Sequence, residues 1–461
     1  MEYNHFVEAE KKQHNYNGIT EGVIWKQLLS FFFPIFFGTF FQMLYNTVDA
    51  IIVGQALGKE ALAAVGGGTS TMINLIIGFF TGVSSGATVV ISQYYGAKDG
   101  SKTKKSVHTA VTLALIAGIL ISIIGYACTK PLLHLISTPE DIMPLAETYL
   151  HIYFAGALSI VAYNMGAGIF RALGDSKHPL YFLIAGAVTN TVLDIVFIVI
   201  LKKGVMGAAL ATVISQIISA SLTLLWLGRR KDAAKLSIKD LCLDRTILQN
   251  MLRIGIPAGI QSIMYNISNM LVQTRVNGFG TDTAAAWAAY GKLDFIFWMM
   301  VNSFGISATT FVGQNYGAGK IDRAKKGVRT CLFMTAGATL LMTSIYLTLG
   351  KYGFMLFVSD ANVIDVGMRI LRTIAPTFIT YTAIEILSGA SRGAGKAIIP
   401  TLFTVIGICG LRVIWLNIPF LMESIERVMI CYPVSWTIVS ILFVIYYNTG
   451  DIYSEKRLKV H

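Results

Sequence analysis

The stretch QYYGAKDGSKTKKSV at residues 93–107 decides the fold, because the chain repeats its pattern at residues 314–328 as QNYGAGKIDRAKKGV. Gln, the second Tyr, Gly, Ala, Lys-Lys and Val align without a gap at an offset of 221 residues. The same offset aligns FRALGDSKHP (170–179) with SRGAGKAIIP (391–400), which gives each half an equivalent Arg, Gly and Pro. Two blocks at one offset indicate an internal duplication.

The composition places both halves in a membrane. The chain has 461 residues, of which 54% are hydrophobic and only 13% charged, and its mean hydropathy is +0.62. A soluble domain carries about 25% charged residues and alternates polar and apolar faces. Long stretches that are apolar on every side indicate helices surrounded by lipid, so a soluble multi-domain protein is excluded.

Twelve apolar runs are long enough to span a membrane, which needs about 20 residues in a helix. Pro34 in the first run and Pro257 in the seventh each remove a backbone hydrogen bond, so they predict bends. The approximate spans are 28–53, 61–93, 106–127, 144–168, 179–201, 206–227, 250–277, 284–314, 327–349, 366–389, 398–420 and 428–448.

Six spans in each half is an even number, so both halves start on the same side of the membrane. The repeats are therefore parallel, related by a pseudo-two-fold axis along the membrane normal. We expect an all-α protein with an N-terminal tail and lobe (1–227), a cytoplasmic linker (228–249), and a C-terminal lobe with its tail (250–461). Two such bundles predict an alternating-access carrier.

Positive charge is distributed unevenly between the two sets of loops. The tails and the loops after even-numbered spans hold 24 of the 37 Lys and Arg residues, whereas the opposite loops hold 6. The positive-inside rule then places both termini in the cytoplasm. The same bias accounts for the net charge of +12, so no nucleic-acid partner is needed. The five widely spaced cysteines contain no CxxC pair, which favours neither a disulfide framework nor a zinc site.

The first lobe contains two carboxylates deep in its spans, Asp49 and Asp194. A carboxylate at a helix centre costs about 2.5–3.5 kcal/mol, so it indicates function. Asn190 lies one turn from Asp194, and Thr212 and Asn164 add a hydroxyl and an amide at similar depth. These oxygen ligands suit Na⁺, and the carboxyl pair can equally take up a proton, so the sequence predicts a coupling site for one of these ions.

The second lobe contains a different set of charges. Glu385 is the repeat partner of Asn164, and Lys292 and Asp294 lie two residues apart, where they do not face each other on a helix. Arg275 and Arg412 are candidate partners for Asp294 or Glu385. This set is either a gating or substrate-charge network or a purely structural ion-pair network.

Aromatic and sulfur-containing side chains suit a cleft for flat, lipophilic cations, although aromatic residues that face lipid are common in any membrane helix. The candidate substrate residues are Met43, Tyr45, Met264, Tyr265, Trp287, Tyr290 and Glu385.

The sequence resembles the bacterial branch of the multidrug and toxic compound extrusion (MATE) family over nearly its whole length. The resemblance rests on the Asp49 helix, the two repeat blocks above, and the following segments: VGQALGKEALAAVG (53–66), GVSSGATVVISQYYGAKD (82–99), TNTVLDIVFI (189–198) and GVMGAALATVISQ (204–216). It implies an exporter driven by inward Na⁺ or H⁺ flux, with a cation site at Asp49, Asp194, Asn190 and Thr212 and a supporting amide at Asn164. Some members carry an acid in the seventh helix where this chain has Tyr265, so the resemblance does not extend to a cation site of that kind in the C-terminal lobe.

These observations predict a multi-pass transporter of the bacterial cell membrane, acting as a monomer without a cofactor, that exports amphipathic cationic compounds. A lipid-linked oligosaccharide flippase is the alternative, because Arg275, Lys292 and Arg412 could hold a pyrophosphate. An enzyme is not expected, since the chain lacks the HExxH, GxSxG and GxxxxGK[ST] motifs.

Overall fold

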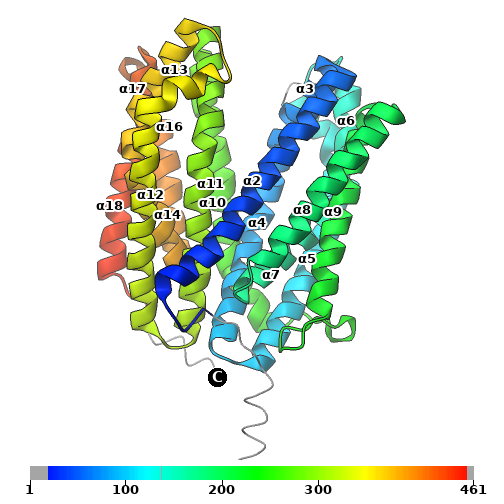
Figure 1. Ribbon diagram of the computed structural model, residues 1–461, viewed down its shortest axis with the longest axis vertical. Helices are drawn as coiled ribbons and strands as arrows, with labels where there is room; N and C mark the ends of the chain where they lie inside the picture. The colour runs from blue at the N-terminus through cyan, green and yellow to red at the C-terminus, as the bar shows by residue number, and fades with distance from the viewer. Residues whose placement is uncertain (1–18, 137, 454–461) are drawn as a thin grey trace, which may run out of the picture. The chain divides into compact units, whose positions relative to one another are not determined.

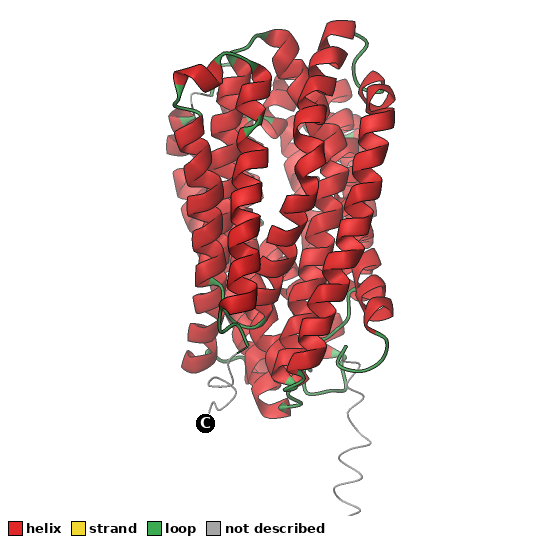
Figure 2. Cartoon of the chain, turned by 90° about the vertical axis from the view of Figure 1, so that its left-hand side faces the viewer, coloured by secondary structure: helices red, strands yellow, loops and turns green. Residues whose placement is uncertain are grey.

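The computed structural model describes residues 19–136 and 138–453, and within these ranges every regular element is a helix (Figure 2). Lipid supplies no hydrogen-bond partners, so a helix, which satisfies its own backbone, is the natural form for apolar runs of this length.

The first half of the chain forms the elements labelled α2 to α9 in Figure 1. They are α2 (Ile24–Leu57), α3 (Lys59–Gly66), α4 (Gly68–Gly96), α5 (Gly100–Leu135), α6 (Met143–Ala155), α7 (Ala157–Ala172), α8 (Lys177–Asp194), which continues as a π-helix, η1 (Ile195–Ile200), and α9 (Gly204–Gly228).

The second half begins after a short 3₁₀ turn, η2 (Ile238–Asp240), in the linker. Its elements are α10 (Arg245–Asn277), α11 (Thr281–Gly317), α12 (Ile321–Met355), α13 (Ala361–Ile374), η3 (Ala375–Thr377), α14 (Phe378–Gly393), α15 (Ile398–Thr404), the π-helix η4 (Val405–Gly410), α16 (Leu411–Trp415), η5 (Pro419–Met422), α17 (Ile425–Met429) and α18 (Cys431–Thr449).

The helices confirm the prediction of an all-α, twelve-span protein. In the described ranges, 10 helices are long and apolar enough to cross a membrane, and the pair α6 and α7, bent by 51°, makes an eleventh span. The twelfth is α10, a continuous helix of 33 residues. Its hydropathy is lowered by amides and hydroxyls such as Gln261, Asn266 and Ser268.

The internal repeat is visible in the helix boundaries. The helices α4 and α11 end at Gly96 and Gly317, and α7 and α14 end at Ala172 and Gly393. Both pairs keep the offset of 221 residues. The backbone repeats as well, because Gly174 and Gly395 follow α7 and α14 with φ angles of 85° and 82°. Such positive φ values favour glycine, so the two RxxG turns share one geometry.

The chain divides into two compact units, which are described here separately. The first unit contains Phe33–Gly255, and the second contains Thr20–Phe32 and the chain from Ile256 onward. The borders therefore fall inside two helices, α2 and α10, and each border lies within two residues of a proline, Pro34 or Pro257.

One close helix crossing occurs in both units at equivalent positions of the repeat. In the first unit, a Cβ placed on Gly168 of α7 would lie 2.7 Å from Thr88 Oγ1 of α4. In the second, a Cβ on Gly389 of α14 would lie 2.9 Å from Thr309 Oγ1 of α11. The glycines allow the helix backbones to approach closely, as small residues commonly do between membrane helices.

The linker is attached to the first turns of α5. His108 Nε2 lies 3.0 Å from the Ser237 amide nitrogen, Lys104 Nζ lies 2.8 Å from Asp240 Oδ2, and the Asp244 amide donates to Thr109 Oγ1. The linker therefore packs as part of the first unit.

Candidate functional site

The predicted carboxylates of the first unit meet. Asp49 of α2 and Asp194 of α8 lie close enough for their side chains to interact directly. The two residues are 145 positions apart in the chain, on helices that Figure 1 labels α2 and α8. The structure thus places two acidic groups at one point inside the lobe.

Asp194 and Asn190 are the most buried members of this cluster. Asp194 is 0% exposed and Asn190 is 1% exposed. Within the described ranges, neither carboxyl oxygen of Asp194 has a hydrogen-bond donor, and both amide atoms of Asn190 also have no partner. Oδ1 of Asp49 is also buried without a hydrogen-bond partner in these ranges. Buried polar atoms normally have a hydrogen-bond partner, so a bound ion or proton would supply the partner that these atoms lack.

Two tyrosines extend the cluster to α6 and α9. Tyr149 of α6 interacts with Asp49 and with the Thr212 side chain. Tyr45, one turn before Asp49 on α2, interacts with both aspartates and with Gln216 of α9. Thr212 therefore joins the site through Tyr149. We call Asp49, Asp194, Asn190, Thr212, Tyr45, Tyr149 and Gln216 the carboxyl cluster.

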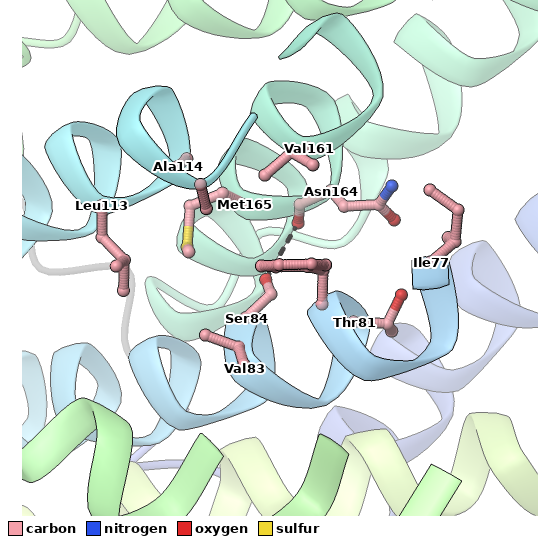
Figure 3. Close-up of a pocket in the computed structure, with 11 residues that line it drawn as sticks. Ile77, Thr81, Val83, Ser84, Leu113, Ala114, Val161, Asn164 and Met165 are labelled. Carbon is pink, nitrogen blue, oxygen red and sulfur yellow. Dashed lines mark hydrogen bonds between the residues drawn. The ribbon is translucent and has the colours of Figure 1, made fainter. Parts of the chain in front are cut away.

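Asn164 lies in a separate small pocket between α4, α5 and α7 (Figure 3). Its Nδ2 donates to Ile160 O at 2.8 Å, and its backbone carbonyl accepts from Ser84 Oγ at 3.2 Å. The space left by the lining side chains is about 10 Å³, roughly that of one water. Within the described ranges these contacts involve neither Asp49 nor Asp194, so the supporting role of Asn164 stays a prediction.

The second unit pairs Glu385 with a residue that the sequence analysis did not choose. Glu385 Oε1 lies 3.5 Å from Arg392 Nη2, two turns along α14, and Oε2 accepts from the Tyr381 hydroxyl at 3.4 Å. The Tyr381 hydroxyl also lies 3.4 Å from that of Tyr265. The expectation that Arg275 or Arg412 pairs with Glu385 is therefore wrong, because α14 supplies its own arginine on the same face.

Asp294 is held by aromatic neighbours. It is 9% exposed, and its Oδ2 accepts a hydrogen bond from Trp298 Nε1 one turn away, while the Tyr290 side chain also interacts with it. Among the described residues, no ion pair forms between Asp294 and Arg275 or Arg412, so that pairing is also wrong. The aromatic donors replace the cation that we expected.

Of the remaining substrate candidates, Tyr290 and Trp287 stack with ring centroids 5.1 Å apart. The side chains of four others are partly exposed: Met43, Met264, Tyr265 and Trp287. Their role in a substrate cleft stays a prediction.

Sequence reasoning missed Gln216, Tyr149 and Arg392. The sequence could have indicated Gln216, because it lies one turn after Thr212 on an apolar helix and so shares its face. It could also have indicated Arg392, which is the repeat partner of Arg171. No feature of the sequence indicated Tyr149, since a tyrosine near the end of a membrane helix is common in the interfacial belt.

The arrangement of the helices and of the buried acidic groups first defines the class of protein. Twelve membrane-length helices in two repeated halves, with acidic groups buried inside a lobe, characterise a membrane transporter. The MatE family model matches residues 34–196 and 257–417, once in each half. The chain therefore belongs to the MATE family, which confirms the resemblance seen in the sequence.

Known proteins agree with this assignment. The "Probable multidrug resistance protein YpnP" of Bacillus subtilis is 31% identical over 82% of this chain and 84% of its own length. YoeA of the same organism, also named a probable multidrug resistance protein, is 27% identical over 92% and 94%. A solved MATE structure in a bent conformation superposes with a TM-score of 0.85 at 22% identity, covering 93% of this chain and 95% of the other.

Proposed function

We propose that this protein exports amphipathic, predominantly cationic organic compounds in exchange for inward flow of Na⁺ or H⁺ through the carboxyl cluster. Membership of the MATE family and the two relatives named as probable multidrug resistance proteins support export of drug-like compounds. The chain acts as a monomer in the bacterial cell membrane, with both termini in the cytoplasm.

The single observation that carries the coupling proposal is the direct contact between the Asp49 and Asp194 carboxyl groups, beside an Asn190 amide that has no hydrogen-bond partner in the described ranges. Two adjacent buried carboxyl groups cannot both stay charged unless a cation lies with them or one of them holds a proton. The oxygens of Asp49, Asp194, Asn190 and Thr212 are hard ligands that would hold Na⁺.

Ion release has an adequate driving force. One elementary charge that moves inward across 100 mV releases about 2.3 kcal/mol. In the cluster, binding and release change the charge seen by Tyr45 and Tyr149, whose hydroxyls connect α2 with α9 and α6. A change of charge at Asp49 would therefore alter how α2 packs on its neighbours, and this alternation would couple the ion to transport.

The test is dye efflux from proteoliposomes in which a Na⁺ or an H⁺ gradient is imposed separately. We expect one gradient to drive ethidium transport by the unaltered protein. Asp49→Asn and Asp194→Asn should reduce gradient-driven transport to the level of empty vesicles, because an amide neither binds nor releases a proton and is a weaker ligand for Na⁺.

The matched control is Asp365→Asn on α13, whose carboxylate is exposed and pairs with Arg369. It should leave efflux unchanged. Full gradient-driven efflux in both cluster variants would refute the coupling site. The flippase alternative predicts a different outcome, in which no dye is exported and lipid-linked precursors accumulate in cells that lack the protein.

A further inference from the structure

The linker between the two halves of the chain carries exposed apolar side chains. Ile238 begins the 3₁₀ turn η2, outside the membrane-length helices, and is 85% exposed. Leu243, five residues later in the linker, is 45% exposed. Two exposed apolar side chains are ordinary on a protein surface, so their meaning depends on where the linker holds them.

Contacts with α5 hold the linker at the border of the apolar layer. The Ser237 amide nitrogen lies 3.0 Å from His108 Nε2, and the Asp244 amide donates to Thr109 Oγ1. His108 and Thr109 lie at the start of the apolar run of α5. In Figure 1 the linker is the green loop beside the lower ends of α5 and α9. Ile238 directly follows Ser237 and is therefore held at the level where the hydrocarbon layer meets the lipid headgroups.

The end of α9 marks the same level. Trp226 is 42% exposed and lies two residues before α9 ends at Gly228. Tryptophans of membrane helices gather where the membrane meets water. The Leu236 amide donates to the carbonyl of Leu227 at 3.1 Å, which brings the chain back to this level just before Ile238.

The linker also carries positive charge that its own acidic residues do not neutralise. Asp232 pairs with Arg230, and Asp240 pairs with Lys104 of α5. The third acidic residue, Asp244, accepts a hydrogen bond at the start of α10. Within the described ranges the other exposed bases before and within η2 form no ion pair: Arg229, Lys231, Lys235 and Lys239. Basic groups beside apolar side chains are the combination that binds a surface of anionic lipid.

We propose that the linker is a binding site for anionic phospholipid. Ile238 and Leu243 enter the headgroup layer, and Lys231, Lys235 and Lys239 bind the lipid phosphates. In the proposed orientation this layer belongs to the cytoplasmic leaflet. Because contacts with α5 fix the linker, bound lipid would hold the first lobe at a set depth in the membrane. The inference goes beyond the proposed export function and does not depend on it.

A bimane label at residue 238 tests the contact with lipid. Ile238→Cys is made in the full-length chain together with Cys128→Ser and Cys242→Ser, because the other three cysteines are buried. The protein is placed in nanodiscs that contain phosphatidylcholine and phosphatidylglycerol in equal amounts. Bromine, which quenches bimane on contact, is carried on the acyl chains of one lipid or the other, so the overall composition stays the same. We expect both lipids to quench the label, and phosphatidylglycerol to quench it at least about twofold more strongly.

Separate variants test the charge and the depth. Lys231→Gln, Lys235→Gln and Lys239→Gln together should make the two lipids quench equally. Bimane on Ser101→Cys, exposed and about 10 Å beyond His108 along α5, should be quenched several-fold less by either lipid. The matched charge control removes three exposed lysines from the opposite loops and should leave the preference for phosphatidylglycerol unchanged: Lys59→Gln, Lys203→Gln and Lys351→Gln.

Each alternative gives a different result. Equal quenching by both lipids with all the linker lysines present would overturn the preference for anionic lipid. No quenching at residue 238 would overturn the membrane contact and leave the surface to a soluble partner. If inorganic phosphate, at matched ionic strength, removes the preference for phosphatidylglycerol, the lysines bind a free anion and the lipid assignment fails. None of these measurements uses transport, so failure of the export proposal would leave the lipid site standing.

Discussion

Single residues decide how closely the helices approach. At Gly86 of α4, an added Cβ would lie 2.2 Å from the carbonyl oxygen of Met251 and 2.6 Å from the amide nitrogen of Gly255, both on α10. Those neighbours are backbone atoms in the first unit, so no side-chain rotation can relieve the clash. The contact requires glycine for its lack of a side chain rather than for its backbone freedom.

Gly86→Ala should therefore lower the stability of the protein by about 1–3 kcal/mol, the range for overpacking in a well-packed core. The melting temperature in detergent measures this effect. Gly337→Ala on α12 is the control, because its Cβ would meet no atom within 4 Å, and alanine is the better helix former. An unchanged melting temperature in Gly86→Ala would mean that the two helices separate at little cost.

At the scale of elements, prolines lie where helices pass between compact units. The borders inside α2 and α10 lie beside Pro34 and Pro257. A proline in a helix removes one backbone hydrogen bond and clashes with the preceding turn, so it makes a local site of bending. Pro131 lies inside α5, which belongs wholly to the first unit.

Replacing Pro34 or Pro257 with alanine should restore the missing backbone bond and stiffen the helix at the border. We expect a higher melting temperature together with slower dye transport, measured in proteoliposomes. Pro131→Ala should raise stability without slowing transport. Equal slowing in all three variants would argue against a special role for the border positions.

The linker element carries its own dependence on pH. His108 Nδ1 lies 2.7 Å from the Lys104 carbonyl and must donate to it, so Nε2 is left to accept from the Ser237 amide. Only the neutral ring can do this. The neighbouring Lys104 lowers the pKa of Asp240 mainly through their hydrogen bond. That contact is present above the ordinary pKa of the carboxyl group and is lost as the pH falls through the lowered value.

Strong acidification should therefore release the Lys104–Asp240 contact, because the Asp240 carboxyl group is protonated only when the pH falls through its lowered pKa. Hydrogen exchange at residues 234–241, corrected for intrinsic rates, measures this release. His108→Phe should remove the protection of Ser237 at every pH. Protection that does not change in the unaltered protein as the pH falls from neutral to well below the ordinary pKa of an aspartate would rule out Asp240 as the pH-dependent contact.

At the scale of the whole molecule, the charge bias predicts which side of the membrane the linker occupies. Cys242 in the linker is exposed, whereas Cys331, Cys409 and Cys431 are buried and Cys128 is intermediate. Cys242 is therefore a native reporter of orientation.

A membrane-impermeant maleimide should label Cys242 in inside-out vesicles but not in intact cells. Cys242→Ser should remove that labelling and thereby assign it. Labelling of Cys242 in intact cells would invert the proposed orientation and place both termini outside.

The sequence by itself determined the number of spans, the class of fold and the identity of the carboxyl pair. The length of each apolar run, the fixed repeat offset and the cost of a charge in lipid can all be read from the sequence, because none of them depends on the tertiary structure. The predicted spans accordingly agree with the helices to within a few residues at most ends, and Asp49 and Asp194 meet as expected.

Only the tertiary structure decided which partner each charge takes. Helix rotation and crossing set these contacts, and residue spacing does not specify them between elements far apart in the chain. For this reason Arg392, rather than Arg275 or Arg412, pairs with Glu385, and Asn164 lies in a pocket of its own.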